Sequence, residues 1–173
     1  PVAVCNDTTL YLDASGNAAI SAQDLDGGSS DNGAIVAWTA SQLTFTCSDL
    51  GTNNDTLTVT DDGGNTASCV AIVTVIDTIS PVAACQAITV QLNASGTATI
   101  TAAQINNASA DNCSIATLAL DNTSFDCSNV GSNTVTLTVT DQSGNSSTCT
   151  ATVTVEDNVD PVAICQNGSV QLD

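Results

Sequence analysis

The stretch "NTVTLTVTDQSGNSSTCTATVTVE", residues 133–156, contains two runs of alternating residues separated by a turn. In each run apolar side chains occupy every second position and threonine fills the positions between them, which is the period of a strand with one buried face. Threonine is β-branched and suits a pleated surface. The letters "DQSGN" between the runs are typical of a turn. The stretch therefore predicts a β-hairpin that packs one face against a core.

The same hairpin pattern occurs earlier in the chain, at residues 53–76. Residues 1–80 match 81–160 at 35 of 80 positions without a gap, and 161–173 match 81–93 at 8 of 13 positions. A unit of this length is too long for a solenoid repeat and suits a small domain that folds by itself. We therefore predict two domains, residues 1–80 and 81–160, followed by the first strands of an incomplete third repeat at 161–173.

Each unit also contains shorter strand candidates bounded by Gly, Asn, Asp or Ser. About seven short strands per unit, with no helical period, favour an immunoglobulin-like sandwich. The predicted fold class is all-β, with tandem immunoglobulin-like β-sandwich repeats of 80 residues each. In the first unit the shorter candidates are Val2 to Cys5, Thr9 to Leu12, Ala18 to Ser21, Ile35 to Trp38 and Leu43 to Cys47.

The composition excludes several classes of function. The chain has no Lys, Arg or His, and its 17 Asp and one Glu give a formal charge of -18. It therefore cannot contact nucleic-acid phosphates or an anionic membrane through cations, and it has no apolar run of about 18 residues that could span a membrane. It also lacks the residues of a Ser-His-Asp or Cys-His centre, and short loops leave little room for a carboxylate pair in a cleft. We expect no enzyme.

Cysteine usage indicates an oxidising, extracellular compartment. Eight cysteines with neither a CxxC pair nor a histidine favour disulfides over zinc. Cysteines recur in the first and last predicted strands of each unit at one fixed spacing along the sequence, and we expect them to bond. The predicted pairs are Cys5 with Cys69 and Cys85 with Cys149.

The remaining four cysteines do not follow one rule. We expect Cys113 to pair with Cys127 inside the second unit. The first unit has Gly33 at the position of Cys113, so Cys47 is expected to be either buried and unreactive or joined to a cysteine outside its own unit. The partner expected for Cys165, at the spacing of the first two pairs, would lie outside the sequence.

Acidic residues gather in the predicted loops, where they have two interpretations. Carboxylates at alternating spacing are the hard oxygen ligands that Ca²⁺ prefers, whereas Asp and Asn are also ordinary turn residues, and a strongly acidic surface also favours solubility. Three acidic positions are kept in both units: Asp31 with Asp111, Asp61 with Asp141, and Asp77 with Asp157. The candidate metal ligands are Asp24, Asp26, Asp31, Asp61, Asp62, Asp77, Asp141, Asp157 and Asp160.

The links between units are the places where a bound Ca²⁺ would matter most. Each link carries acids just before a proline, which fixes φ where the next unit begins. Asp77 is the acid kept at the first link, and the hairpin turn supplies Asp61 and Asp62 or, in the second unit, Asp141 as further ligands. The alternative is a short linker stiffened by proline, whose acids are only solvated.

The whole chain resembles a known family of repeats. The strings that carry the resemblance are "DASGNAAI" (13–20), "NASGTATI" (93–100), "DNCSIATL" (111–118), "FDCSNVGSNTVTLTVTDQSGNSSTCTATVTVED" (125–157) and "DPVAICQ" (160–166). They resemble hyalin repeats, and in particular the SprB-type repeats of large Bacteroidota surface adhesins. The resemblance implies an extracellular surface protein, exported by type 9 secretion and connected with gliding motility. It also implies O-glycosylation at Thr8, Thr56 and Thr78.

These observations predict a structural segment of an extracellular adhesin or filament, in which the repeats provide length and stiffness. Its partners would be neighbouring repeats or subunits, with an external surface or glycan as the adhesion target. The alternative is an accessory module that binds polysaccharide or protein. Sugar-binding faces usually display several aromatic rings, and this chain has four aromatic residues in all: Tyr11, Trp38, Phe45 and Phe125.

One strand predicts a lateral contact. On the outward face of its last strand, the first unit has Val70, Ile72 and Ile76 where the second has Thr and Glu. An exposed apolar stripe of this kind is typical of an interaction surface. We expect it to pack against a neighbouring domain or subunit, unless a loop covers it.

Overall fold

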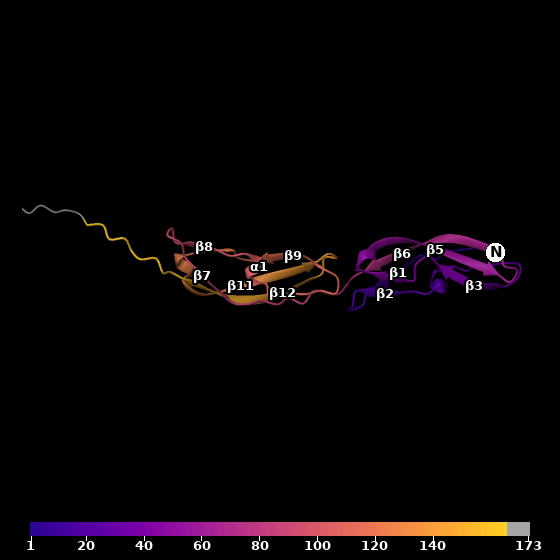
Figure 1. The fold of residues 1–173 in the computed structure, drawn as a ribbon, viewed down its shortest axis with the longest axis horizontal. Coiled ribbons are helices and arrows are strands. Elements are labelled where there is room, and N and C mark those ends of the chain that lie inside the picture. The colour runs from indigo at the N-terminus through magenta and orange to yellow at the C-terminus, as the bar shows by residue number, and fades with distance from the viewer. Residues whose placement is uncertain (166–173) are drawn as a thin grey trace, which may run out of the picture.

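The computed structural model describes residues 1–165, which form two sandwich-like sheet sets placed end to end (Figure 1). Every element of the second set has its counterpart at the equivalent position of the first. The first set contains β1 (Thr8–Tyr11), β2 (Asn17–Ala19), η1 (Ala22–Leu25), β3 (Ile35–Ala40), β4 (Thr44–Thr46), η2 (Cys47–Asp49), β5 (Gly51–Asp61) and β6 (Thr66–Ile76). The second contains β7 (Ile88–Gln91), β8 (Thr97–Thr99), α1 (Ala102–Ile105), β9 (Ile115–Leu120), β10 (Ser124–Asp126), η3 (Cys127–Asn129), β11 (Gly131–Asp141) and β12 (Ser146–Glu156).

A long β-hairpin, β5-β6 in the first repeat and β11-β12 in the second, forms the centre of the four-stranded sheet. In the first repeat the sheet order is β1-β6-β5-β3, and β2 pairs with β4 in a separate two-stranded sheet. β5 and β6 are antiparallel, from Gly51 opposite Val75 to Thr60 opposite Thr66, whereas β1 runs parallel to β6. Because the first and last strands run in the same direction, the chain enters at one end of the sandwich and leaves at the other. This topology lets the repeats follow one another end to end.

The core lies between the two sheets and is built mainly from the alternating face of the hairpin. Leu57, Val59 and Val73 are fully buried, whereas the side chains between them point outward. Phe45 of β4 and Leu25 of η1 close the core from the opposite side. The one-turn helix that places Leu25 was not expected from the sequence, because a single turn is too short to show a helical period.

Disulfides hold the beginning of each repeat to its last strand. They join Cys5 to Cys69 and Cys85 to Cys149, with Cα atoms 5.8 Å apart in both, and these are the pairs that the recurrent spacing predicts. The segment around Cys5, expected as a strand, makes only isolated bridges instead. The disulfide therefore fixes a segment that has little sheet pairing of its own.

The predicted third repeat lies mostly outside the described residues. Residues 161–165 have no regular secondary structure, and 166–173 are not described. The assignment of 161–173 to the first strands of a third repeat stays a prediction.

The two repeats place a carboxylate differently near one buried position of the long hairpin. Asp55 is 1% exposed, and its Oδ1 accepts hydrogen bonds from the backbone of Ser41 at 2.9 Å and of Gln42 at 3.0 Å. In the second repeat Val135 takes the place of Asp55, and Asp121 takes the place of Ser41. Asp121 accepts a 2.9 Å hydrogen bond from the backbone of β11, which lowers the pKa of this carboxyl. The carboxylate thus lies in β5 in the first repeat and directly after β9 in the second.

This exchange predicts a compensating pair of substitutions. Asp55→Val removes the acceptor of two backbone N–H groups and should lower the free energy of unfolding by about 1–3 kcal/mol. Adding Ser41→Asp recreates the arrangement of the second repeat and should recover most of the loss. Urea unfolding of the two variants and the parent measures both effects. A double variant less stable than Asp55→Val alone would contradict this account.

Candidate metal centre at the joint between the repeats

The region where the two repeats meet, which we call the joint, is organised around Asp77, the residue that follows β6. Its side chain is 3% exposed, and its Oδ1 accepts a hydrogen bond of 3.0 Å from the backbone N–H of Ile79. The backbone carbonyl of Asp77 accepts a 3.1 Å hydrogen bond from the side chain of Asn145, in the hairpin turn of the second repeat. The residue that ends one repeat is thus held by the next.

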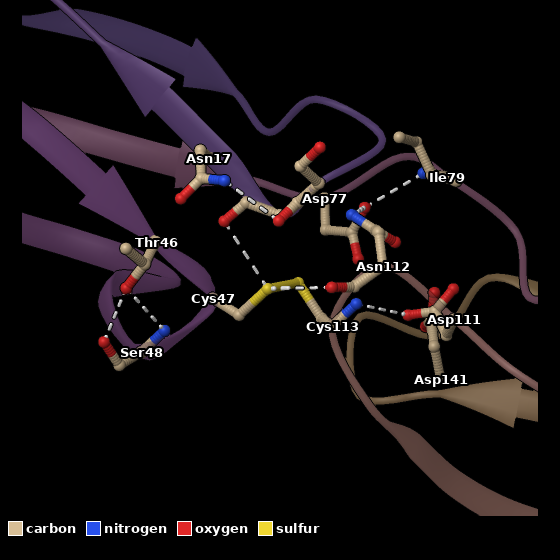
Figure 2. Close-up of a disulfide and its surroundings, with 12 residues drawn as sticks. Asn17, Thr46, Cys47, Ser48, Asp77, Ile79, Asp111, Asn112, Cys113 and Asp141 are labelled. Carbon is tan, nitrogen blue, oxygen red and sulfur yellow. Dashed lines mark hydrogen bonds between the residues drawn. A yellow bond between two sulfur atoms is a disulfide. The ribbon is translucent and has the colours of Figure 1, made fainter.

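A disulfide between Cys47 and Cys113 joins the repeats covalently (Figure 2). Its Cα atoms are 5.4 Å apart. The expected pair of Cys113 with Cys127 is therefore wrong, because Cys113 lies at the end of the second repeat that faces the first, whereas η3 places Cys127 at the opposite end. Cys47 is the counterpart of Cys127 in the first repeat. It lies at the end of the first repeat that meets the second, and it can therefore reach Cys113. Cys127 and Cys165 are the free, exposed cysteines.

Asn112 fills the space next to this disulfide. Its Nδ2 donates hydrogen bonds of 3.2 Å to the backbone carbonyl of Asp13 and to Asp77 Oδ1. The loop of the second repeat comes so close that a Cβ atom on Gly16 would lie 2.8 Å from the Asn112 carbonyl and 2.6 Å from Cys47 Sγ. With a φ of +72°, Gly16 is also in the left-handed region that favours glycine. A side chain at this position would push the two repeats apart.

Three carboxylates meet at the joint: Asp77, Asp111 and Asp141. One oxygen atom from each lies within 4.8 Å of the others. Asp77 comes from the end of β6, Asp111 from the loop before β9, and Asp141 from the end of β11. Each belongs to one of the three acidic pairs that both repeats keep. The structure therefore brings together Asp77 and Asp141 of the predicted ligands, and adds Asp111.

The hydrogen bonds of the cluster leave oxygen atoms without a partner. Asp141 accepts two hydrogen bonds from Asn145, of 2.8 and 2.9 Å, and Asp111 Oδ2 accepts one of 3.0 Å from the backbone of Cys113. The buried atoms Asp77 Oδ2 and Asp111 Oδ1 have no hydrogen-bond partner. The neighbouring side chains thus fix the carboxylates in place but do not neutralise them.

The electrostatics of this cluster favour a cation. Two like charges 4 Å apart repel by about 1 kcal/mol in water and about 4 kcal/mol at an effective dielectric constant of 20. Asp77 and Asp141 are 3% and 2% exposed, so water screens them poorly, and the sequence has no Lys, Arg or His to offset them. Ca²⁺ binds oxygen at about 2.3–2.6 Å, so ligands on opposite sides of the ion are about 5 Å apart. The spacing of the cluster suits such an ion.

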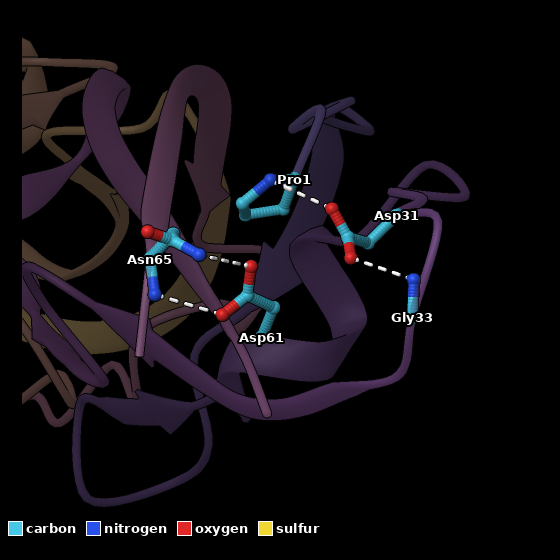
Figure 3. Close-up of polar contacts among 5 residues, drawn as sticks. All are labelled: Pro1, Asp31, Gly33, Asp61 and Asn65. Atoms are coloured by element: carbon cyan, nitrogen blue, oxygen red, sulfur yellow. Dashed lines mark hydrogen bonds and ion pairs between the residues drawn. The ribbon is translucent and has the colours of Figure 1, made fainter. Parts of the chain in front are cut away.

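The outer end of the first repeat carries the counterparts of two of these acids (Figure 3). Asp61 accepts hydrogen bonds of 2.7 and 2.9 Å from Asn65, as Asp141 does from its own asparagine. Asp31 accepts a 2.8 Å bond from the backbone of Gly33, and its Oδ1 lies 2.9 Å from the amino group of Pro1. Asp31 and Asp61 thus accept the same kinds of hydrogen bond as Asp111 and Asp141 accept at the joint.

These contacts shift the pKa values of the two acids. The hydrogen bond from the backbone N–H of Gly33 lowers the pKa of Asp31. The hydrogen bond from the Asn65 side chain lowers the pKa of Asp61, although the nearby charge of Asp31 acts in the opposite direction. Both carboxyls are therefore ionised at neutral pH and correspond to two of the three acids at the joint.

The other predicted ligands lie away from the cluster. Asp24 accepts hydrogen bonds from Ser21 in its own loop, and these lower its pKa. Hydrogen bonds from Ser29 lower the pKa of Asp26, which also accepts a 3.2 Å bond from Trp38 Nε1. These contacts are typical of turn residues. Asp62 is exposed in the hairpin turn, and Asp157 and Asp160 are exposed at the far end of the second repeat.

The predicted interface and glycosylation residues stay predictions. Val70 and Ile72 are 57% and 41% exposed, and Ile76 is half-buried. Of the threonines implied by the family resemblance, Thr56 and Thr78 are exposed and Thr8 is half-buried.

Residues 76–155 match the family model described as "HYR domain". The match contains all three carboxylates of the joint and covers nearly the whole second repeat. The second repeat is HYR-like. No curated protein matches the chain.

Several solved structures resemble the chain at low identity. The four-domain extracellular fragment of protocadherin gamma B7 is 14% identical, with a TM-score of 0.38; the match covers 88% of this chain and 50% of that one, so the present chain spans half its length. Human mucin-like protocadherin EC1-2 is 14% identical, with a TM-score of 0.39 and coverage of 89% and 98%. The fibronectin(III)-like modules of Clostridium thermocellum CbhA are 9% identical, with a TM-score of 0.34 and coverage of 96% and 97%. Among residues 1–165, no helix is long and apolar enough to cross a membrane.

The disulfide at the joint should restrict movement between the repeats. Cys113→Gly introduces the residue that the first repeat has at this position, and it should leave the Cys5–Cys69 and Cys85–Cys149 pairs intact. Small-angle scattering should then show a broader range of interdomain distances, because hydrogen bonds alone would hold the joint. Cys127→Ser is the matched control and should leave the scattering unchanged. A Cys113→Gly curve that overlays the parent curve would show that the disulfide does not limit movement.

Proposed function

We propose that this chain is a structural segment of an extracellular adhesin or filament, whose repeats provide length and stiffness. The observation that carries the proposal is the joint itself, where a disulfide and three side-chain hydrogen bonds hold consecutive repeats. A flexible linker would need none of these contacts. Parallel first and last strands extend the array in one direction, which suits a protein that must reach away from its anchor.

The compartment follows from the cysteines. Three disulfides in a chain of 173 residues need an oxidising environment, such as the outside of a cell. The resemblance to SprB-type repeats supports the finer proposal of a Bacteroidota surface adhesin, exported by type 9 secretion and connected with gliding. In this proposal the chain is not an enzyme, and its partners are neighbouring repeats and an external surface or glycan.

The exposed side chains favour this role over a sugar-binding module. Phe45 and Phe125 are buried, and Trp38 is half-buried with its Nε1 bonded to Asp26. Tyr11 is therefore the one aromatic ring that is well exposed, at 62%. A single ring gives a poor platform for stacking against a polysaccharide.

We also propose that the joint binds Ca²⁺ through Asp77, Asp111 and Asp141. The ion would neutralise three close carboxylates and connect the end of one repeat to two loops of the next. Two of the three residues belong to the second repeat, so binding would stabilise the joint more than either sandwich alone. The first repeat keeps Asp31 and Asp61 at its outer end, ready to act in the same way toward a repeat that precedes it.

Calcium should raise the thermal stability of the chain and reduce movement at the joint. A ligand present at 100 times its dissociation constant stabilises a protein by about 2.7 kcal/mol. We therefore expect millimolar Ca²⁺ to raise the melting temperature by several degrees over a sample with chelator, and titration calorimetry to give one ion per joint. Asp111→Asn should abolish most of this rise.

The matched control for this variant is Asp61→Asn, at the outer end of the first repeat. Asp61 accepts a hydrogen bond from Asn65 as Asp141 does from Asn145, but Asp61 lies in a pair of carboxylates instead of a cluster of three. The Asp61→Asn variant should retain the rise in melting temperature with Ca²⁺. Equal melting curves of the parent in Ca²⁺ and in chelator would rule out a structural ion at the joint.

The adhesin role is tested on the cells that produce the protein. An antibody raised against the chain should label intact cells at a distance from their surface, and deletion of the gene should reduce attachment. Labelling seen only after lysis would exclude a surface filament. A glycan array that gave submillimolar binding to the isolated chain would favour the accessory module instead.

A further inference from the structure

The free Cys127 has the same surroundings as Cys47, which forms the disulfide at the joint. Its Sγ lies 3.7 Å from the carbonyl oxygen of Gly96, and Cys47 Sγ lies 3.7 Å from that of Gly16. A Cβ atom added to Gly96 would lie 2.7 Å from Cys127 Sγ, compared with 2.6 Å between Gly16 and Cys47. Their φ angles, +71° and +72°, also agree. The free thiol is therefore already placed as in a formed joint.

The rest of this end of the second repeat has the same arrangement. A hollow of about 340 Å³ is lined by Asn93, Gly96, Cys127, Asp157 and Pro161, among others. The backbone of Val159 donates a 3.1 Å hydrogen bond to Asp157 Oδ1, just as that of Ile79 donates one to Asp77 Oδ1. At the first joint, the counterparts Asp13, Gly16, Cys47 and Asp77 contact Asn112 or Cys113 of the next repeat. The occupied joint thus shows which segment fits the hollow.

We propose that this end of the second repeat binds the Asp-Asn-Cys loop of a following repeat and forms a disulfide to it through Cys127. The occupant is the counterpart of residues 111–113 in a third repeat, whose first residues we predict at 161–173 from their match to 81–93. The inference rests on the proposed function as a tandem array. In the third repeat the asparagine would donate to the backbone carbonyl of Asn93 and to Asp157 Oδ1, and the aspartate would join Asp157 in a new carboxylate cluster.

The chemistry is the oxidation of two thiols. Cys127 and the cysteine of the loop form one S–S bond and give up two electrons and two protons. A disulfide-bearing oxidant accepts them and is reduced to its dithiol, by exchange through a mixed disulfide. Cys127 is exposed, so both the oxidant and the loop can reach it.

The first repeat shows that such bonds need not be present at every joint. Its own loop reads Asp31-Asn32-Gly33 and therefore offers no thiol to a repeat before it. The Asp and Asn of the loop are kept while the cysteine varies. The sequence itself therefore supplies the matched control, a loop with glycine in place of cysteine.

The test lengthens the full chain by a copy of residues 94–160 placed after Asp173, which completes a third repeat. After oxidation with a glutathione redox buffer, non-reducing peptide mass spectrometry should find Cys127 bonded to the appended copy of Cys113. It should also find Cys165 bonded to the appended copy of Cys149, which reports that the third repeat has folded. A Cys→Gly change in the appended loop should leave Cys127 free for alkylation and keep the Cys165 bond.

Alkylation of Cys127 in the unchanged extended chain, with the Cys165 bond formed, would overturn the proposal. It would leave the surface-filament function untouched, because cell labelling tests that function separately.

A second measurement does not depend on the third repeat. A peptide of residues 109–117, carried as its thionitrobenzoate mixed disulfide, should react with Cys127 of the original chain about tenfold faster than the same peptide with Asn112→Ala, because binding raises the effective concentration. Equal rates would also overturn it.

Discussion

One carboxylate, that of Asp77, has to serve both repeats at once. Its Oδ1 accepts hydrogen bonds from the linker at Ile79 and from Asn112 of the next repeat, and the backbone carbonyl of the same residue accepts one from Asn145. It is buried, so the loss of any of these bonds would leave a further polar group unpaired when the joint closes. The position of the second repeat, the approach of its loop to Gly16 and the Cys47–Cys113 bond all depend on this closure.

The charge balance is the basis of our proposal that a cation binds at the joint. A chain with a formal charge of -18 and no basic side chain repels itself wherever acids come close. In the loops of the first repeat, carboxylates such as Asp24 and Asp26 accept local hydrogen bonds instead. At the joint three come together, and Asp77 Oδ2 and Asp111 Oδ1 have no partner. Such an arrangement persists most easily when a cation from solution completes it.

The sequence contained most of the fold but only part of the joint. Strict alternation in residues 133–156 and the match between 1–80 and 81–160 sufficed for the hairpin and the tandem sandwiches, because the strand period is a local property. Asp77 and Asp141 were predicted as ligands, and the retention of Asp111 in both repeats was a signal that it belonged with them. The Cys113–Cys127 pairing failed because counting within one repeat assumes that each domain is self-contained. Which end of a sandwich a loop occupies depends on strand directions that spacing alone does not give.

The bond between Cys5 and Cys69 has a mechanical consequence. When a filament is pulled from its ends, tension enters a repeat near its first residue and leaves after β6. The disulfide carries that load directly across a sequence separation of 64, so the chain between the two cysteines lies off the load path. An extended chain spans about 3.4 Å per residue, and roughly 200 Å of slack per repeat therefore cannot be drawn out. The repeat behaves as an almost inextensible link, and a tether built from such links transmits a pull at once instead of lengthening to absorb it.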